Sequence, residues 1–163
     1  MDAAYQIRLA VEGDVERVVA LDREIENVPH WRVADYLAAL PLIERVPEVS
    51  GTRRCFFVAE SGRAIVGFAV GQVTVLDAEM PAELESVGVA DSVRRAGIGR
   101  ALCEAVIRWA RSCGAEEIEL EVRSSSGGAI ALYSGLGFAA VGVRKKYYRE
   151  PEDDAVLMRL NLS

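Results

Sequence analysis

Three short segments in the second half of the chain carry residues that can do chemistry. Arg94-Arg95-Ala96-Gly97-Ile98-Gly99 stands directly before a helical pattern, Glu121 ends a strand-like run, and Tyr133 follows twelve residues later. The free N–H groups and the dipole of a helix N-terminus attract anions, and glycines let a phosphate approach closely. The first segment therefore predicts a phosphate cradle, to which neighbouring arginines can add charge-assisted hydrogen bonds.

This cradle differs from the common nucleotide-binding loops. No Gly-Lys-Ser/Thr follows it, as in a Walker loop, and its glycine spacing is not that of a dinucleotide fingerprint. A glycine-rich turn without a ligand is the alternative interpretation, because such helix starts are common. If a ligand binds, the pattern favours another anionic cofactor, of which coenzyme A is our candidate.

Glu121 and Tyr133 are a candidate pair for proton transfer at a thioester. An amine must be neutral to attack, and the pKa of an α-amine is about 7.7 to 8.0, against roughly 10.4 for lysine. A carboxylate can take the amine proton directly or through water, and a phenol can protonate the departing thiolate. Taken singly, Glu121 is a solvated charge and Tyr133 a core aromatic, so the interpretation depends on all three segments together.

Hydrophobic periodicity predicts the elements that position these residues. A helix opens at 13–14 and breaks at Pro29, and a second covers 33–40. The clearest helix is 97–113, with Glu104 and Arg108 four apart on its polar face. A short helix at 129–134 ends at glycines, and strands are predicted at 5–9, 55–60, 64–76, 83–89, 117–122, 139–146 and 155–160.

The resulting order is β-α-α-β-β-β-α-β-α-β-β, which predicts an α/β fold with helices on both faces of a mixed sheet. A length of 163 residues, 51% hydrophobic and 27% charged, fits a single domain over 1–163. We see no secretory signal pattern and no apolar run of membrane-spanning length, so we expect a cytoplasmic protein without a membrane partner.

The charge and the cysteines exclude several classes of function. A net charge of -6 and a pI near 4.9 argue against nonspecific nucleic-acid binding and favour a cationic partner. Cys55, Cys103 and Cys113 have no metal-ligand spacing, so we expect buried apolar thiols and no metal. The single histidine, His30, lies far in sequence from the three segments.

With these residues in view, the chain resembles the GCN5-related N-acetyltransferase (GNAT) superfamily, and within it the RimI-type ribosomal-protein-alanine N-acetyltransferases. The residues from Arg94 to Gly99 match the acetyl-CoA pyrophosphate loop, Arg/Gln-x-x-Gly-x-Gly/Ala. Leu120-Glu121-Val122-Arg123, Ala129-Ile130-Ala131-Leu132-Tyr133 and Leu136-Gly137-Phe138 match the RimI-like block. Arg144-Lys145-Lys146-Tyr147-Tyr148 and Asp153 to Met158 match the closing hairpin and last strand.

The resemblance implies a GNAT-like, mixed but mostly antiparallel central sheet flanked by helices, and it implies roles for individual residues. Glu121 falls on the proton acceptor and Tyr133 on the proton donor. The residues implied in cofactor binding are Val87, Gly88 and Val89 on the splayed strand, and Arg94, Arg95, Gly97, Gly99 and Arg100 around the pyrophosphate. Ser126 stands where the family has an Asn, and we expect it to cap the next helix and contact the cofactor. Tyr147 and Tyr148 fall on the wall of the peptide channel.

The implied activity is acetyl transfer from acetyl-CoA to a protein N-terminal α-amine, with a ribosomal protein as the family's acceptor and a monomer or homodimer as the assembly. Residues 26–49 do not match RimI-type sequences, so a small amine or a lysine remains an alternative acceptor. A regulatory module that binds acetyl-CoA without turnover is a third hypothesis. An acidic loop at 150–154 either attracts a basic peptide or is a solvated turn. The resemblance also predicts a V-shaped opening between strands 83–89 and 117–122.

Overall fold

The computed structural model describes residues 4–26, 28, 30–40, 51–94 and 96–163. The first half of the described chain contains β1 (Gln6–Leu9), η1 (Glu12–Asp14), α1 (Val15–Glu24), α2 (Val33–Ala39), β2 (Gly51–Ser61) and β3 (Ala64–Val75). The second half contains β4 (Ala82–Val89), η2 (Asp91–Val93), α3 (Ile98–Ser112), β5 (Glu117–Arg123), α4 (Gly127–Gly135), β6 (Ala139–Arg149) and β7 (Glu152–Asn161). The predicted order of strands and α-helices is confirmed.

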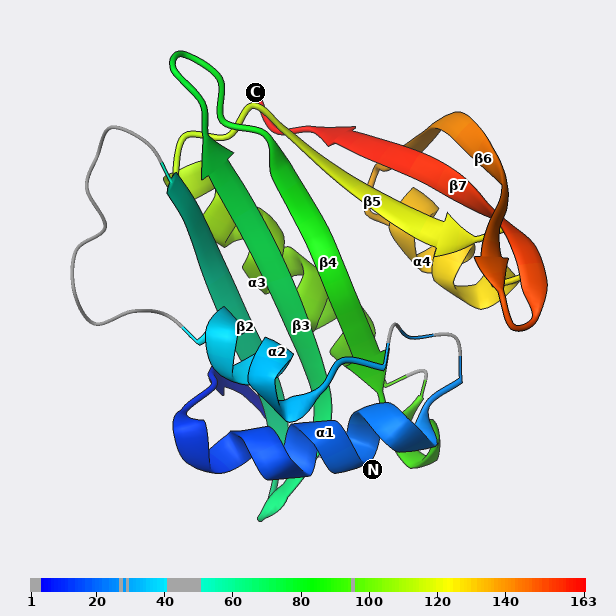
Figure 1. Ribbon diagram of the computed structural model, residues 1–163. Helices are drawn as coiled ribbons and strands as arrows, with labels where there is room; N and C mark the ends of the chain where they lie inside the picture. The colour runs from blue at the N-terminus through cyan, green and yellow to red at the C-terminus, as the bar shows by residue number, and fades with distance from the viewer. Residues whose placement is uncertain (1–3, 27, 29, 41–50, 95) are drawn as a thin grey trace.

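A seven-stranded sheet forms the centre of the described structure, with the order β1-β2-β3-β4-β5-β7-β6 (Figure 1). Every pairing is antiparallel except β4 with β5. The parallel step arises because α3 connects β4 to β5, since parallel neighbours need a long crossover. The sheet is therefore mixed and mostly antiparallel, as the resemblance implied.

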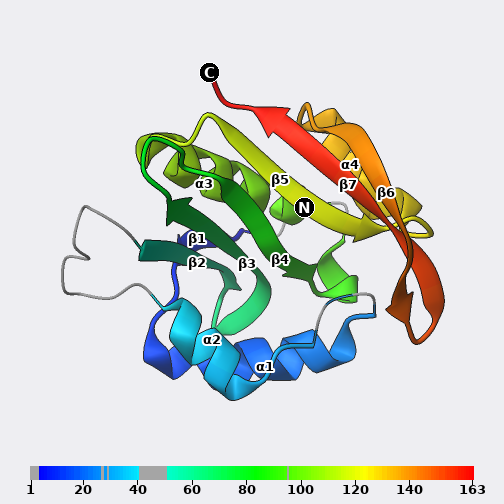
Figure 2. The ribbon, with the colours of Figure 1, turned by 45° about the horizontal axis from the view of Figure 1, so that its top comes forward.

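Helices cover both faces of this sheet (Figure 2). On one face α3 places the fully buried side chains of Ile98 and Leu102 against β3 and β4. On the other face α1 and α2 cover Phe56 and Phe68, which project from β2 and β3. The helix pattern predicted for 97–113 is thus the buried side of α3.

Several element boundaries and one ion pair differ from the sequence predictions. Helix α4 begins at Gly127, two residues early, because an exposed glycine in a first helical turn needs no special conformation. The acidic run is not one loop, since residues 152–154 belong to β7 and pair with β6. On α3, Glu104 bonds Arg100 at 2.9 Å, one turn earlier than the predicted Arg108.

The three cysteines differ in burial. Cys55 and Cys103 are buried, Cys113 is partly exposed, and all three thiols are free. Burial raises the pKa of the thiols of Cys55 and Cys103 to about 12, which keeps them protonated and unreactive. Among the described helices, none is long and apolar enough to cross a membrane.

One buried carboxylate holds the segment between α1 and α2 against the sheet. Asp22 is fully buried and accepts hydrogen bonds from the Tyr36 hydroxyl and from the Trp31 backbone N–H at 3.0 Å. His30 Nδ1 lies 2.8 Å from the same carboxylate, and because a carboxylate only accepts, this nitrogen carries the proton. Burial, and then the bond to Asp22, raises the pKa of Tyr36, so its phenol remains a donor.

Replacing Asp22 by Ala leaves these donors without an acceptor. Hydrogen bonds to a charged group contribute roughly 1.5 to 3 kcal/mol each, so we expect Asp22→Ala to lower the free energy of unfolding by about 3 kcal/mol. Urea denaturation followed by circular dichroism measures this free energy. Glu24→Ala, at an exposed position on the same helix, is the matched control and should change stability by less than about 0.5 kcal/mol. Equal unfolding midpoints for the two variants would contradict the anchoring role.

Candidate active site

The central feature of the site is the early separation of β4 and β5. The parallel ladder between them has only the pairs Ala82 with Ile118 and Glu83 with Glu119. Beyond these pairs β4 runs on to Val89 and β5 to Arg123, and the strands diverge (Figure 1). This is the V-shaped opening that the sequence resemblance predicted. It leaves the backbone edge of β4 from Leu84 onward without a β5 partner.

A bulge in β4 explains why the strands part. Val70 of β3 pairs with Ser86 and the next residue, Gly71, pairs with Leu84, so Glu85 is an extra residue in β4. A bulge bends its strand and increases the local twist, which here turns β4 away from β5. Unpaired backbone N–H and C=O groups then face the opening, where an extended amide-containing ligand can bond them.

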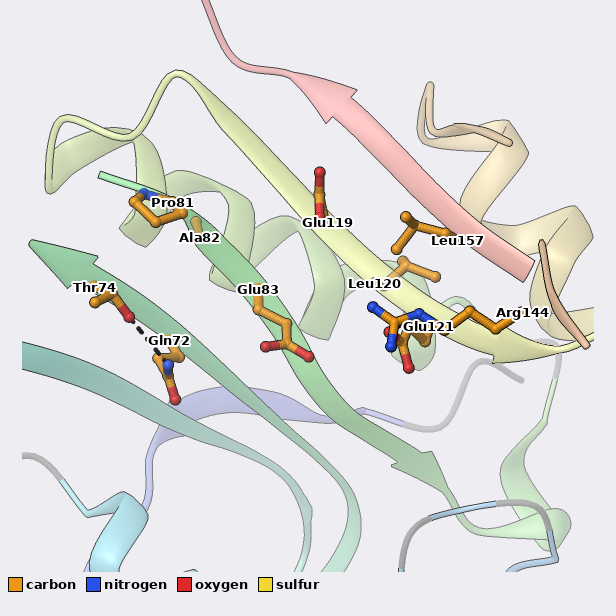
Figure 3. A pocket seen from close by; sticks show the side chains of 10 residues that line it. All are labelled: Gln72, Thr74, Pro81, Ala82, Glu83, Glu119, Leu120, Glu121, Arg144 and Leu157. Atoms are coloured by element: carbon orange, nitrogen blue, oxygen red, sulfur yellow. Dashed lines mark hydrogen bonds and ion pairs between the residues drawn. The ribbon is translucent and has the colours of Figure 1, made fainter. Parts of the chain in front are cut away.

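A pocket of about 240 Å³ lies on the sheet at the start of this opening. Figure 3 shows Glu83 reaching into it from β4, with Glu121 beside Arg144 on the other side. The lining residues come from the strands β3 to β7 and from the residue before β4, and are Gln72, Thr74, Pro81, Ala82, Glu83, Glu119, Leu120, Glu121, Arg144 and Leu157. Because it holds several carboxylates, the pocket suits a cationic group such as an ammonium.

Glu121 lies in this pocket, on the face of β5 away from α3. Its neighbours in the strand, Leu120 and Val122, are buried in the core on the α3 side, which fixes Glu121 on the opposite face. Its side chain is 22% exposed and forms a 3.3 Å ion pair with Arg144. The site therefore offers Glu121 as a solvent-accessible carboxylate that is already paired with a cation.

Tyr133 lies on the other side of β5, in the core that α3 and α4 share. Its ring packs edge-on against Phe138 with the centroids 5.9 Å apart. Burial raises the pKa of its phenol, so Tyr133 stays protonated at physiological pH. It is not among the residues that line the pocket with Glu121. The candidate acid and the candidate base thus stand on opposite faces of the strand.

The cradle residues gather around the N-terminus of α3. Gly97 is the N-cap residue and has the left-handed φ of +82°, a conformation that favours glycine. Arg94 forms a 2.8 Å ion pair with Asp91, and Arg100 is bonded to Glu104. A Cβ added at Gly99 would touch Leu132 and Val89 at ordinary distances, whereas Arg95 lies outside the described residues.

The strand residues 87–89 lead into this cradle. Val87 and Val89 pack towards the core on the α3 side. Gly88 is glycine for a packing reason, because a Cβ there would come within 2.6 Å of the Phe68 ring and 2.9 Å of Ile25. Its lack of a side chain therefore serves the packing of α1, while its backbone remains on the β4 edge.

Ser126 occupies the N-cap position of α4, but its side chain makes no capping hydrogen bond, contrary to our expectation. The neighbouring serines are bound instead to Asp153 of β7, at 2.5 Å from the Ser124 hydroxyl and 2.6 Å from the Ser125 hydroxyl. These bonds lower the pKa of Asp153 to about 2. The loop before α4 is thus held by the β6–β7 hairpin, and the hydroxyl of Ser126 is not used for capping.

The tyrosines of the closing hairpin lie close to Glu121. Tyr147 is 48% exposed and stacks edge-on with Tyr148 at a centroid distance of 5.1 Å. The Glu121 carboxylate, as hydrogen-bond acceptor and through its charge, raises the pKa of Tyr147. The guanidinium of Arg123 lies 4.2 Å from the ring centroid of Tyr148. The structure therefore brings Glu121, Tyr147 and Tyr148 together on one side of the sheet.

Sequence reasoning missed Glu83, which faces Glu121 across the start of the opening. Desolvation by the pocket walls raises the pKa of Glu83, and three neighbouring glutamates, at positions 85, 121 and 119, raise it further. Glu83 lines the pocket and is exposed to solvent. The alternation of Glu83 and Glu85 with apolar Ala82 and Leu84 was the available signal, because it sets both glutamates on one face of a strand that enters the site.

A family comparison gives a match over most of the chain. The profile described as "Acetyltransferase (GNAT) family" matches residues 15–138. The N-alpha-acetyltransferase of Sulfurisphaera tokodaii is 31% identical over 160 residues, which cover 91% of this chain and 89% of that protein. The [ribosomal protein bS18]-alanine N-acetyltransferase of Escherichia coli K12 is 38% identical over 110 residues, 66% of this chain and 71% of that one.

Solved structures show the same fold. The crystal structure of the ribosomal-protein-S18-alanine N-acetyltransferase from Escherichia coli superposes with a TM-score of 0.73 and 25% identity, covering 98% of this chain and 95% of that one. A Salmonella typhimurium structure described with its cofactor acetyl-CoA has a TM-score of 0.73 at 18% identity, with 98% and 95% covered. The second likeness concerns the fold alone.

The backbone at Gly97 gives a test of the cradle's construction. An added Cβ would meet no atom within 4 Å, so the cost of Gly97→Ala comes from the left-handed backbone and not from crowding. We expect a loss of about 1 kcal/mol in the free energy of unfolding of the ligand-free protein. Gly13→Ala is the control, because Gly13 has equally open surroundings and no positive φ. Chemical denaturation measures the free energy of unfolding of both variants. An unchanged value for Gly97→Ala would show that the left-handed backbone at the N-cap has relaxed.

Proposed function

Because the chain belongs to the GNAT family of acetyltransferases, we propose that it transfers the acetyl group of acetyl-CoA to the N-terminal α-amine of a protein. The observation that carries the proposal is the placement of Glu121 in an acidic pocket at the mouth of the β4–β5 opening, with Tyr133 on the other face of β5. The relative from Sulfurisphaera tokodaii, named as an N-alpha-acetyltransferase, and that from Escherichia coli, named as a [ribosomal protein bS18]-alanine N-acetyltransferase, support a protein acceptor.

The two sides of the opening fit the two parts of acetyl-CoA. The free edge of β4 up to Val89 can bond the amide groups of a pantetheine arm, and the N-terminus of α3 at Gly97 can hold the pyrophosphate. Gly99 and Arg100 lie in the first turn of α3, and Arg94 lies just before it. Ser126 stands near the start of α4 with an uncommitted hydroxyl for the same ligand. Acetyl-CoA supplies the activated thioester.

On the acceptor side, Glu121 is the base in this proposal. At pH 7 an α-amine is mostly protonated, so the site must hold an ammonium and remove its proton before attack. A carboxylate in the pocket does both, because it attracts the cation and accepts the proton directly or through a water. The ion pair with Arg144 keeps the carboxyl of Glu121 oriented in the pocket. Tyr147 and Tyr148 form the adjoining wall for the first residues of a peptide.

On the donor side, Tyr133 is the acid. The sulfur that leaves the acetyl carbon carries negative charge, and a phenol beside it can supply a proton. Its raised pKa keeps the phenol protonated over the whole range in which the enzyme works. Base and acid are separated by the strand, so the amine and the sulfur are served from opposite faces and the two proton transfers do not compete.

Acetylation of defined acceptors tests the function. The wild-type protein, incubated with acetyl-CoA and peptides with free or blocked N-termini, should acetylate the free α-amine, including that of an alanine-initiated peptide of basic sequence. Mass spectrometry locates the modified nitrogen. In the same assay Glu121→Gln should lower kcat by about a hundredfold or more, because the amide cannot accept a proton.

Glu116→Gln is the matched control, an exposed glutamate just before β5, and should leave kcat unchanged. Turnover confined to lysine side chains or polyamines would contradict the proposal that the acceptor is a protein N-terminus. Cofactor binding without any turnover would mean a regulatory module. A wild-type rate for Glu121→Gln below pH 7 would remove Glu121 as the base.

Tyr133→Phe tests the acid. The ring contact with Phe138 is kept and only the hydroxyl is lost, so we expect kcat to fall by about tenfold to a hundredfold with KM for the acceptor unchanged. Thiol release, followed with a chromogenic thiol reagent, measures the step. Tyr5→Phe, which removes the hydroxyl of a partly buried tyrosine of the same core, is the control. A wild-type kcat for Tyr133→Phe would show that water protonates the sulfur.

A further inference from the structure

The bulge in β4 changes the face of the sheet to which its side chains point. Leu84 packs in the core on the α3 side, and so does Val87, three residues later. In a regular strand, residues three apart point to opposite faces. The bulge therefore leaves Glu85 and Ser86 side by side on the face away from α3. The extra residue Glu85 thus brings a carboxylate to this face at the point where β4 turns away from β5.

Arg54 of β2 reaches across β3 to this extra residue. Its Nε–H donates to Oε2 of Glu85 at 3.3 Å, and its Nη2 donates to Oε1 of Gln72 on β3 at 2.9 Å. Gln72 in turn donates from Nε2 to the hydroxyl of Thr74 at 3.1 Å, as Figure 3 shows beside the pocket. The side chain of Glu85 is 12% exposed, so its carboxylate is largely removed from water. One guanidinium therefore ties three neighbouring strands together at the bulge.

This ion pair depends on the register of β4 against β3. Arg54 stands opposite Gln72, and Gln72 stands opposite Glu83, so the row across the strands ends at Glu83. Arg54 pairs instead with Glu85, two residues further along β4. A one-residue slip of β4 at this point would turn Glu85 towards the apolar core under α3 and separate its carboxylate from Arg54. The ion pair therefore favours the register in which the strand bends and the slot opens.

We propose that Arg54 is a positioning residue for acetyl-CoA, which holds the β4 bulge in the form that opens the slot. The proposal rests on the proposed acetyl transfer and deepens it, because the slot is where that reaction places the cofactor. Arg54 is not among the residues that line the pocket, and it acts through Glu85. With the bulge held, the backbone groups of residues 87–89 keep a fixed direction. An extended amide ligand then binds them without first ordering the strand.

Binding of acetyl-CoA to the resting protein tests this role without an acceptor. Arg54→Met keeps the length of the side chain but removes its charge and its donors, so the Kd for acetyl-CoA, measured by isothermal titration calorimetry, should rise about tenfold. Arg54→Lys keeps a cation near Glu85 and should stay within about threefold of the wild type. Arg53→Met is the matched control, because Arg53 is exposed on the other face of the same strand, and its Kd should not change.

Two further measurements separate positioning from a general loss of stability. In Glu85→Met the ion pair is already gone, so the addition of Arg54→Met should raise the Kd by less than about threefold more. Amide hydrogen exchange of the ligand-free protein gives a readout that needs no cofactor. In Arg54→Met the backbone amides of residues 85–89 should exchange about fivefold faster than in Arg53→Met, because the strand is no longer held at the bulge.

Failure of this role is distinguishable from failure of the proposed function. A wild-type Kd or wild-type exchange for Arg54→Met overturns the positioning role, whatever the stability of the variant. An equal rise in Kd for Arg54→Met with and without Glu85 also overturns it, because Arg54 would then act by another route. A wild type that binds acetyl-CoA but acetylates only lysine or small amines defeats the acceptor assignment, yet the Kd values still decide the role of Arg54. A wild type that does not bind acetyl-CoA overturns both proposals.

Discussion

The separation of β4 from β5 is the constraint on which the rest of the site depends. Two neighbouring strands of one sheet pair at only two positions and then diverge, because Glu85 is an extra residue in β4 and bends it. Such a gap costs backbone hydrogen bonds, and the packing of α3 against both β3 and β4 holds the strand in place without them. The gap is therefore a slot between the two strands that is lined by free backbone groups. Its β4 side leads into the N-terminus of α3.

The slot also divides the chemistry between the faces of the sheet. Alternation along β5 sends Glu121 to the open pocket, whereas Leu120 and Val122 are buried beneath it. Helix α4 then returns on the opposite face and places Tyr133 in a drier environment, where burial keeps the phenol protonated. In the proposed reaction the base exchanges its proton with solvent and the acid stays protonated until the sulfur leaves, and the two faces of the strand supply these two environments.

Local periodicity was enough to predict the elements and their order, and the family resemblance carried by the motifs from Arg94 to Phe138 predicted the opening. Periodicity failed where the choice among possible contacts is made only in the folded structure. The hydroxyl of Ser126 was expected to cap α4 but makes no capping hydrogen bond, whereas the hairpin residue Asp153 binds the hydroxyls of Ser124 and Ser125 on the same loop. Glu104 had a cation one turn away in each direction, and periodicity alone cannot choose between them. Glu83 was not singled out, because its place in the pocket follows from the register that sets it opposite Glu119 of β5.

The carboxylates of the pocket face opposing demands. Attraction of an ammonium requires a charge that persists at neutral pH, whereas acceptance of its proton requires a carboxylate that gives up that charge easily. The ion pair with Arg144 holds the carboxyl of Glu121 in the pocket, where in the proposed reaction it attracts the ammonium and then accepts its proton. Because the strands diverge at this point, Glu83 and Glu121 share the pocket without forming a ladder pair.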